Sequence, residues 1–345
     1  MRVLYHLSSP PPPVPGTDAV VQEIEALRGR FGGGLSLLYP FRRPGLPWPR
    51  SLYGLHRLGA LRAEEADADL HHVYGPDLYV YPVLRLLRRP VVYTVTTSLR
   101  PRPPNRGALP AIHTAVVSNR RDLATARSWP VARAVLIRPG IDLSRFTPAP
   151  RSLAGQVTLL VGSAPWTRRQ FRGKGIDVLL EAARRMPALS LVFLWRGLLL
   201  DEMRGRVARL GLEDRVEVVS DKVDVNRILA RVHAAIVLAE EPTIVKAFPH
   251  SLLEALAAGK PVLASRAIPM ADYVEETGCG LVVEQVAADA VVASLEALAS
   301  RYDELRRRAE AVRGDGFSQE AMLAAYAALY AEVAGTRPAA PADRA

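Results

Sequence analysis

A chain of 345 residues is longer than one hydrophobic core usually supports, so we expect two domains. Hydrophobic residues make up 49% of it and charged residues 23%, which excludes a largely disordered protein. The single cysteine excludes an internal disulfide, and no apolar run is long enough to span a bilayer, so we expect a cytoplasmic protein.

The net charge of +10 arises entirely in the first 150 residues. They hold 20 arginines, no lysine and 10 acidic residues, whereas the remainder is electrically balanced. A basic half attracts phosphate groups, whether these belong to nucleic acid, to an anionic membrane or to an acidic substrate. Charge alone does not choose among the three.

Along the chain, short β-branched runs alternate with longer segments of helical period, and this alternation occurs twice. The pattern is typical of an α/β fold with parallel sheets. We predict strands at residues 2–7, 35–39, 69–74, 90–95, 114–118 and 134–137 in the first half, and at 157–161, 190–195, 216–220, 234–238, 261–265 and 280–283 in the second.

The predicted domains are residues 1–140 and 157–316, joined by a proline-containing linker over residues 141–156. A last helix over residues 317–335 is expected to pack back on the first domain, and residues 336–345 are expected to form a disordered tail. Two doubly wound domains that face each other form a central cleft. Ligands of such sheets bind beyond the carboxyl ends of the strands.

A basic loop follows the strand at 157–161, beginning at Gly162, before a helix resumes near Asp177. The loop gathers four cationic residues, Arg168, Arg169, Arg172 and Lys174. Fixed cations, glycine amides and a helix N-terminus suit a diphosphate and neutralise it without a metal. A solvated basic loop with no ligand explains the same residues equally well.

The segment over residues 240–265 predicts a helix with Ser251 as its N-cap and a buried apolar face. Glu254 lies three residues after Ser251, which is the spacing of a capping box. In that interpretation Glu254 only binds a free amide of its own helix.

Together these two segments resemble the retaining glycosyltransferases of family 4 (glycosyl transferases group 1), which have the GT-B fold of two Rossmann-like domains. In that family an arginine, four further residues and a lysine hold the diphosphate of the donor, and Arg169 and Lys174 reproduce this spacing. Arg168 and Arg172 are alternatives for the arginine. The resemblance covers about residues 135–315.

The family's second signature is two glutamates separated by seven residues, of which the later binds the ribose hydroxyls of the donor. Glu254 matches the later glutamate, and Lys246 occupies the earlier position. Because lysine donates hydrogen bonds and accepts none, we expect Lys246 to contact a phosphate or an acidic sugar. A solvent-facing loop lysine is the alternative.

Further donor contacts follow from the resemblance. Gly162 ends the first strand beside the donor, and the backbone amides of Gly16 and Thr17 meet the diphosphate, with Thr17 as the N-cap of the first helix. Met270 and Ala271 offer backbone contacts to the sugar or diphosphate. The predicted catalytic residues are Arg169, Lys174 and Lys246.

The resemblance implies a retaining, metal-independent glycosyltransferase without a cofactor, which uses a UDP-, GDP- or ADP-sugar. The acceptor is not identified by the sequence; a lipid-linked or cell-envelope glycan is our candidate. Two arginine- and proline-rich stretches, residues 40–62 and 99–110, are candidates for a surface that holds it or rests on the inner face of an anionic membrane. Nucleic acid is not expected.

Two alternatives to this function stay open. One is a nucleotide-sugar epimerase on the same fold, and the other is a degenerate protein that binds nucleotide sugars without catalysis.

Overall fold

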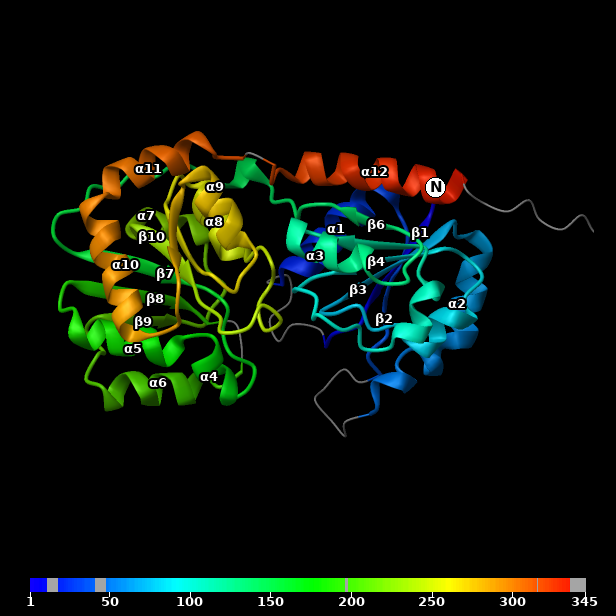
Figure 1. The fold of residues 1–345 in the computed structure, drawn as a ribbon, viewed down its shortest axis with the longest axis horizontal. Coiled ribbons are helices and arrows are strands. Elements are labelled where there is room, and N and C mark those ends of the chain that lie inside the picture. The colour runs from blue at the N-terminus through cyan, green and yellow to red at the C-terminus, as the bar shows by residue number, and fades with distance from the viewer. Residues whose placement is uncertain (11–17, 41–47, 196–197, 315, 336–345) are drawn as a thin grey trace, which may run out of the picture. The chain divides into compact units, whose positions relative to one another are not determined.

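The computed structural model describes residues 1–10, 18–40, 48–195, 198–314 and 316–335 (Figure 1). By its internal contacts the chain divides into two compact units. The first consists of Met1–Pro10, Glu23–Arg138 and Glu320–Ala345, and the second of Pro11–Gln22 and Pro139–Gln319.

In the first unit the described strands form one parallel six-stranded sheet with the order β2-β1-β3-β4-β5-β6. The strands are β1 (Val3–Leu7), β2 (Leu35–Leu37), β3 (Leu70–Gly75), β4 (Val91–Val95), β5 (Thr114–Val117) and β6 (Ala134–Leu136). The α-helices are α1 (Ala19–Phe31) from Glu23 onward, α2 (Leu58–Glu64), α3 (Arg120–Arg127) and α12 (Gln319–Gly335) from Glu320 onward. Short 3-10 helices lie at η1 (Arg50–Leu52), η2 (Leu55–Arg57), η3 (Glu65–Asp67), η4 (Pro82–Leu86) and η5 (Arg106–Ala111).

The described strands of the second unit form another parallel six-stranded sheet, in the order β12-β11-β10-β7-β8-β9. The strands are β7 (Val157–Val161), β8 (Leu189–Leu194), β9 (Val216–Val219), β10 (Ala234–Val237), β11 (Val262–Ser265) and β12 (Gly280–Val283). The helices are η6 (Leu143–Arg145), α4 (Arg169–Gly173), α5 (Ile176–Arg185), α6 (Leu200–Arg209), α7 (Val225–Arg231), α8 (His250–Ala257), α9 (Met270–Thr277), α10 (Ala288–Ser300) and α11 (Tyr302–Ala311).

The sheet of the second unit has a hydrophobic core on each of its faces, as a doubly wound sheet requires. Successive residues of a strand point to opposite faces. Accordingly Leu160 of β7 lies in one core, and its neighbours Leu159 and Val161 lie in the other. Helices α7, α8 and α9 cover the first core, and α5, α6 and α10 cover the second.

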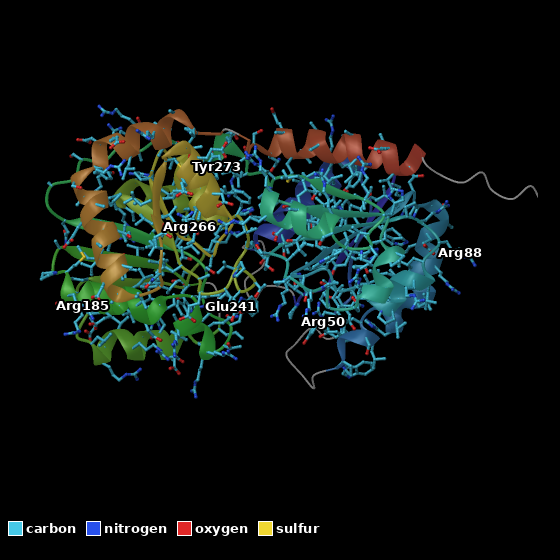
Figure 2. The ribbon with its side chains drawn as sticks, viewed as in Figure 1. Arg50, Arg88, Arg185, Glu241, Arg266 and Tyr273 are labelled. Atoms are coloured by element: carbon cyan, nitrogen blue, oxygen red, sulfur yellow. The ribbon has the colours of Figure 1, made fainter. Side chains whose placement is uncertain are left out.

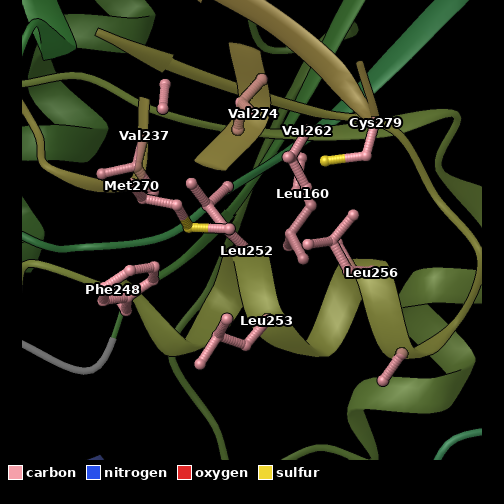
Figure 3. Close-up of a cluster of buried hydrophobic side chains, with 14 of the residues drawn as sticks. Leu160, Val237, Phe248, Leu252, Leu253, Leu256, Val262, Met270, Val274 and Cys279 are labelled. Carbon is pink, nitrogen blue, oxygen red and sulfur yellow. The ribbon is translucent and has the colours of Figure 1, made fainter. Parts of the chain in front are cut away.

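Helix α8 contributes Leu252, Leu253 and Leu256 to the first of these cores, where they lie with Met270 of α9 and the thiol of Cys279 (Figure 3). All five side chains are buried. Burying leucine and methionine side chains stabilises the fold by about 1.5–3 kcal/mol each. This packing fixes α8 and α9 against the sheet, and with them the loops that precede both helices.

Two local predictions are wrong. Helix α8 begins at His250 with Pro249 as its N-cap, so Ser251 and Glu254 lie inside the helix and form no capping box. The reason is that Pro249 holds the extended φ of −62° and ψ of 125°, and a proline fits the position before a helix without losing a hydrogen bond. The basic loop, in turn, contains a short helix, α4.

In the first unit, neighbouring residues on β3 carry buried polar side chains to opposite faces of the sheet. On one face, His71 Nε2 lies 2.8 Å from Glu65 Oε1, and His71 Nδ1 lies 2.8 Å from His6 Nε2. On the other, His72 Nδ1 lies 2.5 Å from the hydroxyl of Tyr330 on α12. Tyr330 is buried, so α12 is joined to this sheet by a polar contact within an apolar layer.

All twelve predicted strands are present, each end within two residues of the expected position. Among the residues that the structure describes, no helix combines the length and the apolar character needed to cross a bilayer.

Candidate functional site

Three loops of the second unit emerge at the same edge of its sheet. They follow β7, β10 and β11, which are adjacent and parallel, so their carboxyl ends lie side by side. This is the edge at which ligands of open parallel sheets bind. Most of the residues predicted for the donor lie on these loops or on the helices that follow them.

The turn after β7 is held against α8 by a contact between Gly162 and Ser251. A methyl group on Gly162 would lie 2.2 Å from Ser251 Oγ and 2.6 Å from Ser251 Cβ, so only glycine fits there. The next residue, Ser163, adopts a left-handed φ of 69°. Such a conformation costs about 1–3 kcal/mol in a residue other than glycine and is found mostly at functional sites.

Lys174, between α4 and α5, is buried with 5% of its surface exposed. Its Nζ donates a hydrogen bond of 3.0 Å to the carbonyl oxygen of Ala164 in the turn after β7. Burial lowers the pKa of Lys174 to about 8. Behind it, the carbonyl of Gly173 accepts a 2.8 Å hydrogen bond from the amide of Glu240, which follows β10. The lysine is therefore fixed to the loops of two neighbouring strands.

The three arginines of this segment differ in their partners. Arg168 pairs with Glu202 at 3.1 Å and Arg172 pairs with Glu240 at 3.6 Å, although both arginine side chains are largely exposed. Arg169, the first residue of α4, is exposed and has no ion pair among the described residues. Among these arginines Arg169 has the side chain most available to an incoming anion.

Lys246 lies in the segment before α8, with its Nζ 3.6 Å from Oδ1 of Asp18, and both residues belong to the second unit. The same Asp18 oxygen accepts hydrogen bonds from the amides of Val20 at 2.7 Å and Val21 at 3.3 Å. Asp18 therefore has the position of the N-cap of α1, and Thr17, which the sequence predicted for this role, lies outside the described residues.

Met270 and Ala271 begin α9, and their side chains are buried. The amide of Met270 donates to the carbonyl of Ala247 at 3.1 Å, and that of Ala271 donates to Ile268 at 2.9 Å. The Met270 amide thus joins α9 to the segment of Lys246, and the Ala271 amide is held by the loop after β11.

A cation on the loop after β11 is neutralised by acidic neighbours. Arg266 donates to Glu275 and to Glu284, each at a shortest distance below 3 Å, and these bonds raise its pKa (Figure 2).

Glu254, in the second turn of α8, is half-buried. Gly16 and Thr17 lie outside the described residues.

This edge therefore combines a glycine contact, a strained serine, an exposed arginine and a buried lysine. Residues 167–314 match the family model described as Glycosyl transferases group 1. This part of the chain belongs to that family.

Solved structures share the fold of the whole chain at low sequence identity. Sucrose-phosphate synthase from Thermosynechococcus elongatus has a TM-score of 0.73 and 18% identity, over 98% of this chain and 100% of that one. HepE from Anabaena, in complex with UDP and glucose, has a TM-score of 0.74 and 16% identity, over 96% and 100%. WaaG, a glycosyltransferase involved in lipopolysaccharide biosynthesis, has a TM-score of 0.66 and 15% identity, over 96% and 99%.

No curated protein sequence matches the chain. The two parallel sheets and these structural likenesses confirm the predicted fold, a GT-B arrangement of two Rossmann-like domains. The family match lies within the second unit, and the structural likeness extends over both units.

Sequence reasoning missed three residues of this candidate site: Asp18, Ser163 and Glu240. Asp18 could have been found as a favourable N-cap immediately before a helical segment. No local signal predicts the left-handed conformation of Ser163. The contacts of Glu240 depend on tertiary packing between β10 and the α4 segment, which the linear pattern does not contain.

Proposed function

We propose that the chain is a retaining, metal-independent glycosyltransferase of family 4 that uses a UDP-, GDP- or ADP-sugar. The contact between Gly162 and Ser251 carries the proposal, because it holds the turn before Arg169 and Lys174 against the helix of Glu254. HepE from Anabaena, which shares this fold, has been solved in complex with UDP-glucose, and this supports a nucleotide-sugar donor here.

Arg169 and Lys174 are assigned to the diphosphate. The ammonium of Lys174 has three N–H donors, one of which is directed at the Ala164 carbonyl, so two are left for phosphate oxygens. Arg169 adds a planar guanidinium that binds a phosphate through two parallel hydrogen bonds. Both cations stabilise the negative charge that develops on the leaving diphosphate.

Glu254 and Lys246 are assigned to the remainder of the donor. Glu254 lies in the second turn of α8 and is half-buried, and a carboxylate accepts hydrogen bonds of the kind that ribose hydroxyls donate. Lys246 is within 3.6 Å of the Asp18 carboxylate, and this pair presents both a donor and an acceptor. We assign it to a phosphate or to the sugar.

Isothermal titration of UDP, GDP and ADP into the protein tests the donor assignment. We expect one of them to bind, and we expect Lys174→Met to weaken that binding by about tenfold or more, the loss of a charge-assisted hydrogen bond. Lys222→Met, at an exposed lysine between β9 and α7, is the control and should bind as the wild type does. Equal binding by the Lys174 variant and the wild type would reject the assignment.

The proposal also includes a lipid-linked or cell-envelope acceptor and a cytoplasmic location at the inner face of the membrane. Its support is the basic charge of the first 150 residues and the single, buried cysteine. Once an acceptor has been identified, the anomeric configuration of the product tests whether the configuration of the donor is retained. Full activity in a chelating buffer tests independence of metal.

A further inference from the structure

We infer that the acceptor carries a phosphate group, which is bound by Arg100, Arg102, Arg106 and Arg120 at the carboxyl edge of the first unit's sheet. This inference rests on the proposed function, because only a transferase has an acceptor. It adds the chemical class of that acceptor and the side chains that recognise it.

The four arginines follow two adjacent strands. Arg100, Arg102 and Arg106 lie after β4, and Arg120 opens the helix after β5; β4 and β5 pair in parallel, so both loops emerge at one edge. Residues 96–121, which span these loops, contain five arginines and no acidic residue. The strand order thus brings a purely cationic stretch to the ligand-binding edge of the sheet.

The loop after β4 is fixed at two points. The amide of Leu99 donates a 2.9 Å hydrogen bond to Oδ1 of Asp122, in the first turn of α3. Six residues later, the side chain of Asn105 accepts from the amide of Val80 at 3.0 Å and donates to its carbonyl at 2.7 Å. The backbone that carries Arg100 and Arg102 is therefore fixed at both ends.

Proline stiffens the loop further. Arg100 is followed by Pro101, and Arg102 is followed by Pro103. Proline fixes its own φ and restricts the residue before it to extended conformations, so both arginines have few backbone conformations to lose when a ligand binds. Rigid presentation of this kind increases affinity because less entropy is lost.

The acidic residues near this edge are already engaged. Asp77 accepts two hydrogen bonds from Arg50, of 2.9 and 2.6 Å (Figure 2). Asp122 is buried and is occupied by Leu99 and by Asn119.

The four inferred arginines are exposed, and in the part of the chain that the structure describes none of them has an ion-pair partner. Elsewhere in this unit arginines do find carboxylates, as Arg57 does with Glu64 and Arg133 with Glu332. These four arginines therefore keep a positive charge that no carboxylate among the described residues pairs with.

The guanidinium of arginine is always charged and binds two oxygens of a phosphate or a carboxylate at once, whereas it gains little from a neutral sugar hydroxyl. A phosphomonoester or diphosphate offers more oxygens and more negative charge than a carboxylate, so it can engage several of the four arginines together. The acceptor that we infer is therefore a phosphorylated compound, whether a soluble sugar phosphate or the phosphate headgroup of a lipid.

Titration of inorganic pyrophosphate tests this inference, with the donor site filled by a saturating amount of the nucleoside diphosphate that binds most tightly. The variant is the triple substitution Arg100→Gln, Arg102→Gln and Arg106→Gln. The control is Arg85→Gln with Arg88→Gln. These two arginines are also exposed and without an ion pair among the described residues, but they precede β4 at the opposite edge of the sheet.

We expect the triple variant to bind pyrophosphate about tenfold more weakly than the wild type, and the control to bind within about twofold. Arg102→Lys keeps the positive charge but loses the planar guanidinium, so its affinity for pyrophosphate should lie between those of the triple variant and the control. Equal affinity of the wild type and the triple variant, or an equal loss in the control, overturns the inference while nucleotide binding still supports the transferase. If no nucleotide binds, the transferase and the acceptor assignment are both overturned.

Sedimentation with phosphatidylcholine vesicles that contain phosphatidic acid distinguishes the two phosphate sources. Recruitment of the wild type but not of the triple variant supports a lipid phosphate, and recruitment of neither supports a soluble phosphate. If the triple variant loses vesicle binding but keeps pyrophosphate binding, the arginines form a general membrane surface and the inference is overturned.

Discussion

Gly162 and Ser251 are in contact where the turn after β7 meets α8, with no room for a methyl group between them. The φ of Gly162 is not in the left-handed region, so glycine is needed here for space and not for backbone freedom. The contact links the two segments that carry Arg169, Lys174 and Glu254.

Replacing Gly162 by alanine should therefore separate the two halves of the site. The added methyl group forces α8 or the turn to move, at a cost of about 1–3 kcal/mol in the free energy of unfolding, and nucleotide binding should weaken by about tenfold. Thermal unfolding and titration measure the two effects. Adding Ser251→Gly should restore binding, because it removes both atoms that meet the methyl group; no restoration would contradict this explanation.

Gly205→Ala is a matched control for that experiment. Its methyl group would come no closer than 3.8 Å to Arg209, so we expect no loss of binding. Alanine has the higher helix propensity, and the variant should be slightly more stable than the wild type.

Lys174→Met should leave the protein at least as stable as the wild type at pH 7. Removing a buried ammonium removes its desolvation cost, while leaving the Ala164 carbonyl without a donor costs about 1 kcal/mol. Chemical denaturation measures the balance. A marked loss of stability would show that Lys174 mainly supports the loop.

Donor binding should be accompanied by uptake of a proton at pH 8.5. Burial lowers the pKa of Lys174 to about 8, so most of these lysines are neutral at that pH, and a bound diphosphate favours the charged form. Titration in two buffers that differ in ionisation enthalpy should give different binding enthalpies. At pH 7, where the lysine is already charged, the difference should be much smaller.

Tyr330→Phe should destabilise the first unit by about 1–3 kcal/mol. The variant keeps the ring but leaves His72 Nδ1 without the tyrosine hydroxyl in a buried place. Tyr79→Phe is the control, because its hydroxyl has no hydrogen bond among the described residues and it is only half-buried. A similar loss in both variants would argue against a specific role for this bond.

Stability should fall as the pH decreases below about 6.5. Burial lowers the pKa of His6 and of His71, and it lowers that of His72 to about 3. In this range the unfolded chain binds protons that the folded chain does not, and each histidine removes at most about 1.4 kcal/mol per pH unit.

The groups around these histidines do not reverse that sign. His6 faces His71, which lowers its pKa further; the Glu65 carboxylate partly offsets burial for His71 without restoring its usual pKa. Denaturation midpoints between pH 7.5 and 5.0 measure the effect, and His72→Gln should give a shallower pH dependence. An unchanged slope would show that His72 does not contribute.

The sheets were predictable because β-branched runs bounded by glycine and proline carry their own signal. The first residue of α8 was not predictable in this way. Ser251 has a side chain that favours the N-cap position, but Pro249 has the extended backbone of the N-cap in the structure. The Ser251 side chain, which would suit an N-cap, contacts Gly162 instead. Local propensity predicts that a helix exists better than it predicts where it begins.

The residue types of the candidate site were predictable from the sequence, but the burial and the partners of these residues were not. The spacing of Arg169 and Lys174 suggested a diphosphate, yet nothing in the sequence predicted that one would be exposed and the other buried. The pairing of Lys246 with Asp18 joins residues more than two hundred positions apart, and such a contact has no trace in local composition.

The attachment of α12 to β3 has a consequence for the synthesis of the protein. The first unit needs Tyr330 against His72, although 258 positions of the chain separate the two residues and the second unit is made between them. The strands of the first sheet therefore leave the ribosome well before α12 does. The layer over β3 that contains His72 is thus completed by a segment that is synthesised after the second unit.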